Sequence, residues 1–306
     1  MGIRIVKREY AGWPNCLELS NGALELVVTT DVGPRVIHLG LPGGPNEFAV
    51  KADQAGKTRQ KEWCIFGGHR FWHSPEYLNR TYYPDSEPVQ YRELDTGVIL
   101  TQNVETNTQV RKELEITLDP DAPRVTVVHR MTNMGVWEIE LAPWALSVMD
   151  VGGVAIVPQP TKAHPEGLLP NRTLTLWPYT NMQDPRVLWG EKYILLKQDP
   201  AVTDPFKLGI SANDGWTAYA NNNHLFVKLF DYYEGEPYPD GGSSVEMYTC
   251  DWMLELETLG SLTLLAPDET VEYVEEWILL DGVAKPETEA DVEEQIVPLV
   301  AKLQEE

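Results

Sequence analysis

The chain has 306 residues and a formal net charge of -23, with 24 Lys and Arg residues against 47 Asp and Glu residues. Hydrophobic residues make up 42% of the chain and charged residues 23%, which is the balance of a folded, water-soluble protein. Because so negative a surface repels phosphate backbones and anionic lipids, the composition argues against nucleic acid and membranes as partners.

Signals for export, cofactors and disulfides are missing from the sequence. Residues 1–9 carry positive charge without the apolar run of a secretory signal, and no other run is long enough to cross a bilayer, so we expect a cytoplasmic protein. Cys16, Cys64 and Cys250 are far apart and odd in number, which predicts free thiols rather than a disulfide framework. With no phosphate loop, dinucleotide fingerprint or nucleophile elbow, we expect no cofactor.

The N-terminal third alternates apolar and polar residues, as strands do. Residues 16–20 and 23–28 flank the Asn21-Gly22 dipeptide, which favours a two-residue hairpin because both central positions accept a positive φ. A third strand at 35–41 follows a turn that contains Gly33-Pro34. These residues predict the start of an antiparallel meander.

The same pattern continues to the end of the chain without a long helix before the tail. Further strands are predicted at 97–101, 110–118, 124–131, 193–197, 216–220, 225–230, 244–248, 253–256 and 271–279. Strands that outnumber helices to this degree predict an all-β sandwich of antiparallel strands. No linker rich in Gly, Ser or Pro divides the chain, so we expect a single domain over residues 1–306.

The tail, residues 283–306, is acidic and is the one predicted helix. Thr288 and Asp291 suit a capping box. The apolar residues of one helix face are Val292, Ile296, Leu299, Val300 and Leu303. We expect this helix to pack on the sandwich, with a bend or break at Pro298; a partner-binding helix is the alternative.

Functional side chains are densest just after Gly67-Gly68. They are His69, Arg70, Trp72, His73 and Glu76. Two glycines allow a close approach of the backbone to a ligand, and such a mixture of rings and charges is costly to bury without a purpose. The alternative is a loop with a tryptophan anchor and ordinary hydrogen-bonded histidines.

A metal site would use His69, His73 and Glu76, since two histidines four residues apart lie on one face of a helix. Pro75 and the glycine pair favour a strand and a loop instead. We therefore expect no metal here.

Aromatic residues and a pair of glutamates give two further signals. The 10 Trp and 13 Tyr against 6 Phe favour rings with a polar edge, which suit the C–H faces and hydroxyls of a pyranose. The candidates are Trp72, Trp144, Trp177, Trp216 and Trp252. Any single tryptophan is more often part of the core. Strict alternation over 251–260 places Glu255 and Glu257 on one strand face, where partial burial would raise one pKa; a solvent-exposed face is the alternative.

Taken together, several short motifs resemble the galactose mutarotase-like superfamily, and more closely a bacterial branch of it. The motifs lie at 21–26, 33–37, 67–68, 254–260, 265–270 and 276–277. The resemblance runs from about residue 15 to 282 and implies a β-supersandwich that holds a mono- or oligosaccharide on one sheet. In aldose 1-epimerases a histidine protonates the ring oxygen while a glutamate removes the anomeric proton.

By this resemblance, Glu257 is the catalytic base and His69 or His73 the acid. The resemblance implies a sugar-binding role for His69, Arg70 and His73, and we expect Arg35, Trp72, Glu76, Trp144 and Glu255 to complete the sugar pocket. The central Asn-His-x-Tyr-Phe motif of the epimerases is replaced by residues 141–149, which lack a histidine. A non-catalytic sugar-binding or sensing domain is therefore an alternative, as is a polysaccharide lyase or glycoside hydrolase that pairs two of these glutamates across a glycosidic bond.

Overall fold

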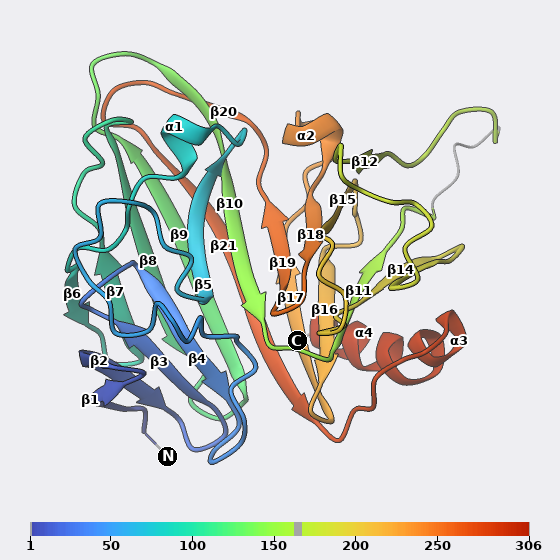
Figure 1. Ribbon diagram of the computed structural model, residues 1–306, viewed down its shortest axis with the longest axis horizontal. Helices are drawn as coiled ribbons and strands as arrows, with labels where there is room; N and C mark the ends of the chain where they lie inside the picture. The colour runs from blue at the N-terminus through green and yellow to red at the C-terminus, as the bar shows by residue number, and fades with distance from the viewer. Residues whose placement is uncertain (1, 162–166, 306) are drawn as a thin grey trace.

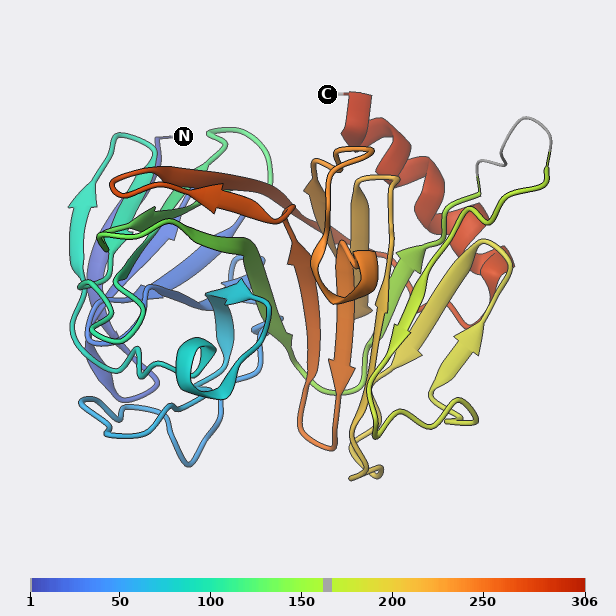
Figure 2. The ribbon, with the colours of Figure 1, turned by 90° about the horizontal axis from the view of Figure 1, so that it is seen from above.

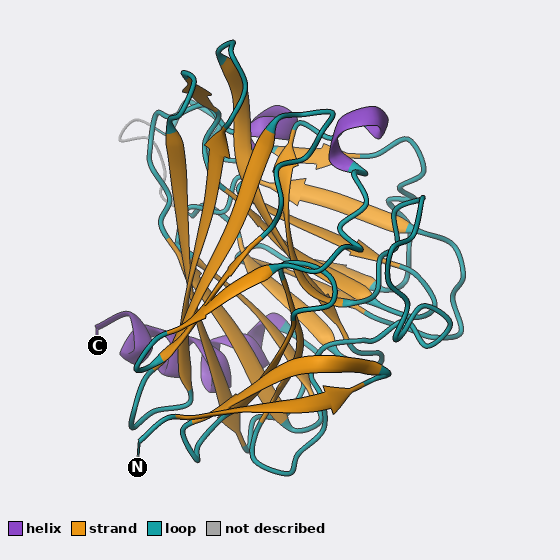
Figure 3. Ribbon diagram, turned by 90° about the vertical axis from the view of Figure 1, so that its left-hand side faces the viewer, coloured by secondary structure: helices purple, strands orange, loops and turns teal. Residues whose placement is uncertain are grey.

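The computed structural model describes residues 2–161 and 167–305 and consists of two antiparallel β-sheets that lie face to face (Figures 1 and 3). Within these residues, one sheet has 11 strands and the other has 10. The predicted all-β architecture with a short C-terminal helix is confirmed.

The first sheet carries the candidate site. Its strands, in spatial order, are β1 (Arg4–Tyr10), β2 (Trp13–Ser20), β3 (Glu25–Thr29), β4 (Arg35–Gly40), β5 (Gly68–Ser74), β10 (Ile139–Met149), β19 (Leu254–Leu259), β18 (Val245–Thr249), β15 (Phe206–Ile210) and β12 (Leu174–Leu176). The short β20 (Thr263–Leu265) pairs with the start of β10. Strands from both ends of the chain therefore meet at β10, beside which β5 and β19 lie.

The second sheet backs the first. Its strands, in spatial order, are β13 (Val187–Trp189), β14 (Tyr193–Lys197), β11 (Val154–Pro158), β16 (Trp216–Asn221), β17 (His224–Phe230), β21 (Thr270–Asp281), β9 (Arg124–Asn133), β8 (Val110–Leu118), β7 (Gly97–Thr101) and β6 (Gln90–Glu93). Short helical turns α1 (Leu78–Thr81) and α2 (Pro239–Gly242) lie near one end of the molecule (Figure 1).

The predicted N-terminal hairpin is present as β2 and β3, but its turn is longer than the predicted two residues, because Ser20 pairs with Glu25 and residues 21–24 connect the strands. The Asn21 side chain accepts hydrogen bonds from the backbone of Ala23 and Leu24, and Gly22 has a φ of 87°. Asn21 also donates to carbonyl groups at Asp119 and Ala122, 2.6 and 2.7 Å away, so the same turn is attached to the β8–β9 turn of the second sheet.

A continuous hydrophobic core fills the space between the sheets. Phe71, Ala145 and Leu256 of the first sheet meet Val127 and Trp277 of the second, all almost fully buried. Because successive side chains of a strand point to opposite faces, every second side chain of β5, β10 and β19 points into this core. The residues between them lie on the opposite face of the first sheet.

The C-terminal helix covers the outer face of the second sheet (Figure 2). It begins with the predicted Thr288–Asp291 capping box at α3 (Glu289–Asp291), passes through a π-helical segment η1 (Val292–Ile296) and continues as α4 (Val297–Glu305). Of the bend or break predicted at Pro298, a break is ruled out, because α4 continues through this residue. Val297 donates to the carbonyl of Val292, five residues back, and this wider turn directly before Pro298 accommodates the missing N–H.

No helix among the described residues is long and apolar enough to span a bilayer.

Candidate functional site

The site is built on five neighbouring strands of the first sheet. The register places Arg70 of β5 opposite Leu146 of β10, which in turn lies opposite Glu257 of β19, itself opposite Glu246 of β18. All four side chains share the face turned away from the core. Sequence-distant charges are therefore arranged in one row across the sheet.

A cavity of about 230 Å³ lies over this row. Its lining residues are Trp63, Ile65, Arg70, Trp72, Glu76, Tyr82, Trp144, Leu146, Tyr179, Lys207, Tyr248, Met253 and Glu255. Because pockets for drug-sized ligands run from about 300 to 1,000 Å³, this volume suits a smaller compact molecule. Aromatic walls with a few charged groups are the lining expected for a polyhydroxylated ring.

Arg70 is the cation on the β5 side of the cavity and is 2% exposed. One of its terminal nitrogens, Nη2, lies 2.7 Å from Glu255, and its guanidinium lies 4.3 Å from the centre of the Trp72 ring. Among the described residues, Nε and Nη1 have no hydrogen-bond partner. Buried donors of this kind are costly unless a ligand or solvent satisfies them.

Lys207 is the cation on the β15 side. Its ammonium lies 2.7 Å from Glu246 and 3.1 Å from Glu257, and the ring centres of Trp144 and Trp177 lie 4.7 and 4.6 Å away. Burial lowers the pKa of Lys207, but the two carboxylates outweigh it and the net pKa lies well above the usual value. The amine is therefore charged at neutral pH.

Glu255 and Glu257 share one strand face, as the alternation predicts, but their surroundings differ. Glu255 borders the cavity and pairs with Arg70. Glu257 is fully buried behind the lining, where its Oε2 accepts from the indole N–H of Trp144 at 2.8 Å and from Lys207. Burial raises the pKa of Glu257 despite the opposing charge of Lys207.

Glu76 and Tyr179 stand at the exposed rim of the cavity. Glu76 accepts a hydrogen bond from the hydroxyl of Tyr82, and burial raises the pKa of that phenol further above neutrality. Burial also raises the pKa of Tyr179 to about 12. Both phenols are therefore protonated donors at neutral pH.

His69 does not reach the cavity, which corrects its predicted role as the acid. It alternates with Arg70 along β5, so its side chain points into the core. The backbone carbonyl of Tyr273 can only accept a hydrogen bond, so Nδ1 of His129 donates to it. Nε2 of His129 therefore accepts a hydrogen bond from Nε2 of His69. Nδ1 of His69 in turn accepts a hydrogen bond from the hydroxyl of Ser147. Burial lowers the pKa values of both histidines, that of His129 to about 4, so the pair is neutral and links the two sheets.

His73 and Arg35 are also displaced from their predicted roles. His73 is 2% exposed on the core face, and burial lowers its pKa well below the usual value, so it cannot serve as the acid over Glu257. Arg35 is fully buried and is not among the residues that line the cavity. It pairs with Asp85 at 2.7 Å and donates to the carbonyls of Ile65 and Gly67, so it holds the segment that carries the cavity wall.

The glycine pair serves the backbone rather than a ligand. Gly67 and Gly68 have φ values of 103° and 70°. A Cβ at Gly67 would lie 2.0 Å from the carbonyl oxygen of Ala49, and one at Gly68 would lie 2.2 Å from that of Val36. Only glycine permits this close packing at the entry to β5.

The histidine pair is also the one described cluster with the donor set of a metal site. The ligand atoms of His69, His129 and Glu275 lie within 4.8 Å of one another. However, the ammonium of Lys228 lies 2.9 Å from Glu275, and the two histidines already satisfy each other. A dication would have to displace a proton and oppose a buried cation, so this cluster fits a metal poorly.

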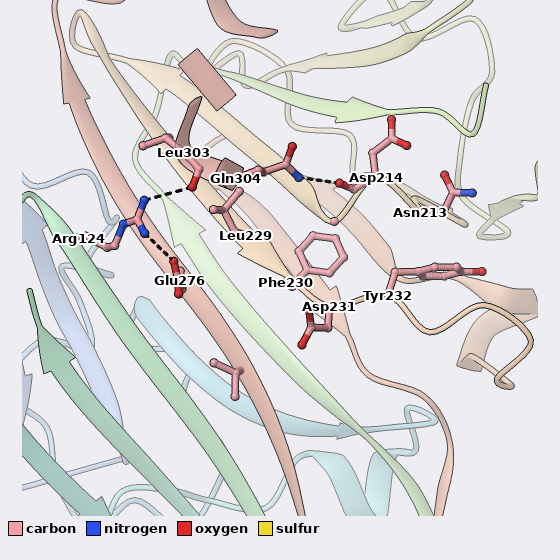
Figure 4. A pocket seen from close by; sticks show the side chains of 12 residues that line it. Arg124, Asn213, Asp214, Leu229, Phe230, Asp231, Tyr232, Glu276, Leu303 and Gln304 are labelled. Atoms are coloured by element: carbon pink, nitrogen blue, oxygen red, sulfur yellow. Dashed lines mark hydrogen bonds and ion pairs between the residues drawn. The ribbon is translucent and has the colours of Figure 1, made fainter. Parts of the chain in front are cut away.

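A larger cavity, of about 500 Å³, lies beside the end of α4 on the outer face of the second sheet (Figure 4). Arg124 joins Glu276 to the carbonyl of Leu303 there, and Gln304 donates to the carbonyl of Asp214 (Figure 4). These contacts attach the helix to the sheet. The aromatic residues that line this larger cavity are Phe230 and Tyr232, whereas six aromatic residues line the smaller cavity. The smaller cavity therefore remains the candidate site.

Several important residues of the site escape the sequence reasoning. Lys207, Glu246, Trp63, Tyr179 and Tyr248 belong to this set. A lysine within the apolar run 206–210 is a usable signal, because a charge in a buried strand requires a partner. Trp63 and Tyr179 lie on loops and Tyr248 on β18, and their mutual approach has no local signature.

Comparison with known proteins identifies solved structures that have a similar fold. No protein-family model and no curated protein matches the sequence. Among solved structures, a galactose mutarotase-like protein from Clostridium acetobutylicum matches with a TM-score of 0.54 and 10% identity over 92% of this chain and 99% of that one. A galactose mutarotase related enzyme from Lactobacillus acidophilus matches with a TM-score of 0.53 and 7% identity over 93% of this chain and 100% of that one.

The fold is galactose mutarotase-like. The Slr1438 protein from Synechocystis sp. PCC 6803 has the same arrangement, with a TM-score of 0.58 and 10% identity over 90% of this chain and 99% of that one. Identity this low establishes the architecture alone. Within this mutarotase-like sandwich, the chemistry has to be argued from the residues of the cavity.

Proposed function

We propose that the protein binds a carbohydrate, one sugar ring of which occupies the cavity above β5, β10, β19 and β15. The observation that carries the proposal is Arg70, whose Nε and Nη1 are buried without a partner among the described residues at an aromatic-lined cavity. Sugar hydroxyls supply acceptors for such donors, and the C–H faces of a pyranose stack on rings such as Trp72.

Titration of the protein with glucose and galactose, followed by NMR or calorimetry, tests this proposal. Arg70→Met should lower the affinity by about tenfold or more, because a charge-assisted hydrogen bond contributes about 1.5–3 kcal/mol. Arg130→Met is the matched control, since Arg130 pairs with Glu113, Glu115 and Glu272 on the far side of the second sheet. Equal binding by both variants, or none by the wild type toward any mono- or oligosaccharide, contradicts the proposal.

Interconversion of sugar anomers is a second candidate, favoured by the two glutamates of β19. A general base needs a pKa near the working pH, and burial raises that of Glu257, whereas Glu255 borders the cavity directly. A mutarotation assay on freshly dissolved α-glucose distinguishes the roles of Glu255 and Glu257. Loss of acceleration in Glu255→Gln alone assigns the base to Glu255, and loss in Glu257→Gln alone assigns it to Glu257. A wild type that binds sugar without accelerating mutarotation is a binding protein.

A further inference from the structure

Lys207 is placed as a fixed hydrogen-bond donor at the cavity. An ammonium group has three N–H donors; one is donated to Glu257, and the ammonium also forms an ion pair with Glu246 at 2.7 Å. Lys207 also lines the cavity, so a remaining donor is available to a molecule bound there. The lysine side chain is 6% exposed, so little of it is left to solvent.

Four groups restrain this ammonium. Trp144 and Trp177 provide cation–π contacts at 4.7 and 4.6 Å, and the two carboxylates lie on adjacent strands. Trp144 also donates to Glu257, so that ring and carboxylate orient each other. A lysine normally moves freely on four methylene groups, whereas this one is held in place before a ligand arrives.

The charge of the cluster favours an uncharged acceptor. Glu246 and Glu257 lie directly opposite each other in the sheet, and both are fully buried. Two buried carboxylates that share one cation retain a proton between them, so the cluster with Lys207 is close to neutral. Arg70, the other cation of the cavity, is paired with Glu255. Neither cation is left in excess for a phosphate or carboxylate ligand.

We propose that Lys207 donates a hydrogen bond to an uncharged oxygen of the bound sugar, and that Glu246 and Glu257 are positioning residues that hold its ammonium at the cavity. This inference rests on the proposed function and deepens it: the cavity selects neutral sugar rings and disfavours phosphorylated or carboxylated ones. The missing central histidine then matters less for binding, since the lysine supplies a donor from a different strand.

Titrations of the whole chain with glucose, galactose and glucose 6-phosphate test the inference. Lys207→Met should weaken binding of the neutral sugar that the wild type prefers by about tenfold or more, and Lys207→Arg should restore part of the loss. The wild type should bind glucose 6-phosphate more weakly than that neutral sugar. Lys112→Met is the matched control, because Lys112 is a buried lysine paired with Glu105 at 2.7 Å outside the cavity.

The outcomes separate this inference from the proposed function. A wild type that binds no sugar overturns the proposed function. A wild type that binds sugar while Lys207→Met binds it equally well overturns the role of Lys207 and leaves the proposed function standing. Tighter binding of glucose 6-phosphate overturns the charge argument. Glu246→Gln should keep neutral-pH affinity and alter its pH profile, as a positioning role requires; an unchanged profile contradicts that role.

Discussion

Glu246 and Glu257 occupy opposite positions on neighbouring strands, with one lysine between their carboxylates. The pKa of Glu246 lies well above its usual value, because burial and the charge of Glu257 together outweigh the attraction of Lys207. The folded protein therefore binds a proton at this position that the unfolded chain releases above about pH 4.5. At residue scale, this proton couples the site to folding.

Stability should consequently fall as the pH rises from the unfolded pKa toward the raised folded pKa of Glu246, since the folded state then binds more protons than the unfolded state. The side chain in Glu246→Gln resembles the protonated glutamate, so this variant should lose much of the decline in stability. Its stability relative to that of the wild type should therefore increase toward pH 8. Thermal unfolding between pH 5 and 8 measures the difference. Parallel curves for the two proteins would show that Glu246 is ionised throughout.

A second buried charge lies in the core between the sheets. Lys228 is 2.9 Å from Glu275, and both side chains are fully buried. Burial alone raises the pKa of Glu275, but the charge of Lys228 and the hydrogen bonds from Thr258 and Lys228 outweigh it, and the net pKa lies below the usual value. Glu275 also accepts from Thr258 of the first sheet, so this pair helps to join the two layers.

Removing the lysine should therefore cost more than an ordinary core substitution. We expect Lys228→Met to lower the free energy of unfolding by about 3–5 kcal/mol, because it leaves the carboxylate of Glu275 without its cation. Lys197→Met, at an exposed position of β14, is the control and should change it by less than about 0.5 kcal/mol. Urea denaturation measures both, and a small loss in Lys228→Met would mean that Glu275 takes up a proton without strain.

At the scale of elements, the C-terminal helix completes the second sheet. Val292, Ile296 and Val300 are buried against Trp216 and Val227 on the outer face of that sheet. The stagger of these three residues matches the predicted apolar face, even though the segment passes through a π-type turn. The helix is therefore a packing element of the sandwich.

Ile296→Ala should lower the free energy of unfolding by about 2–5 kcal/mol, the usual cost of truncating a buried aliphatic side chain. Glu294→Ala, two residues away on the exposed side, should have little effect. Chemical denaturation of both variants gives the comparison. Equal stability would indicate that the helix detaches before the sheets unfold.

At the scale of the whole molecule, the two sheets share one core. Residues from β5, β10 and β19 pack directly on residues from β9, β17 and β21, so separating the sheets would expose apolar surface on both. Residues 1–306 should therefore unfold as a single cooperative unit, in keeping with the expectation of one domain.

Unfolding followed by tryptophan fluorescence and by far-ultraviolet circular dichroism should give coincident transitions, because the 10 tryptophans report tertiary packing while the dichroism reports the strands. Limited proteolysis should not release a stable fragment that retains half of the strands. Two separated transitions would divide the chain into independent units.

The sequence by itself determined many of the strands and their faces, but β1, β10 and β15 were not predicted. Alternation and turn residues predict β8, β9, β16, β17 and β21 close to their observed bounds, because these signals are local. Alternation likewise places Glu255 and Glu257 on one face, and the excess of Trp and Tyr over Phe agrees with a cavity walled by such rings. The resemblance in short motifs led to the architecture that solved structures share.

Only the tertiary structure decided which strands became neighbours and which face of β5 met the cavity. The sequence places His69, Arg70, Trp72 and His73 together, but the pleat sends the histidines into the core and the other two side chains to the cavity. Lys207 reaches the site because β15 pairs with β18, which lies beside β19. Such pairings join residues far apart along the chain, and their energies come from packing and shared burial that no single segment encodes.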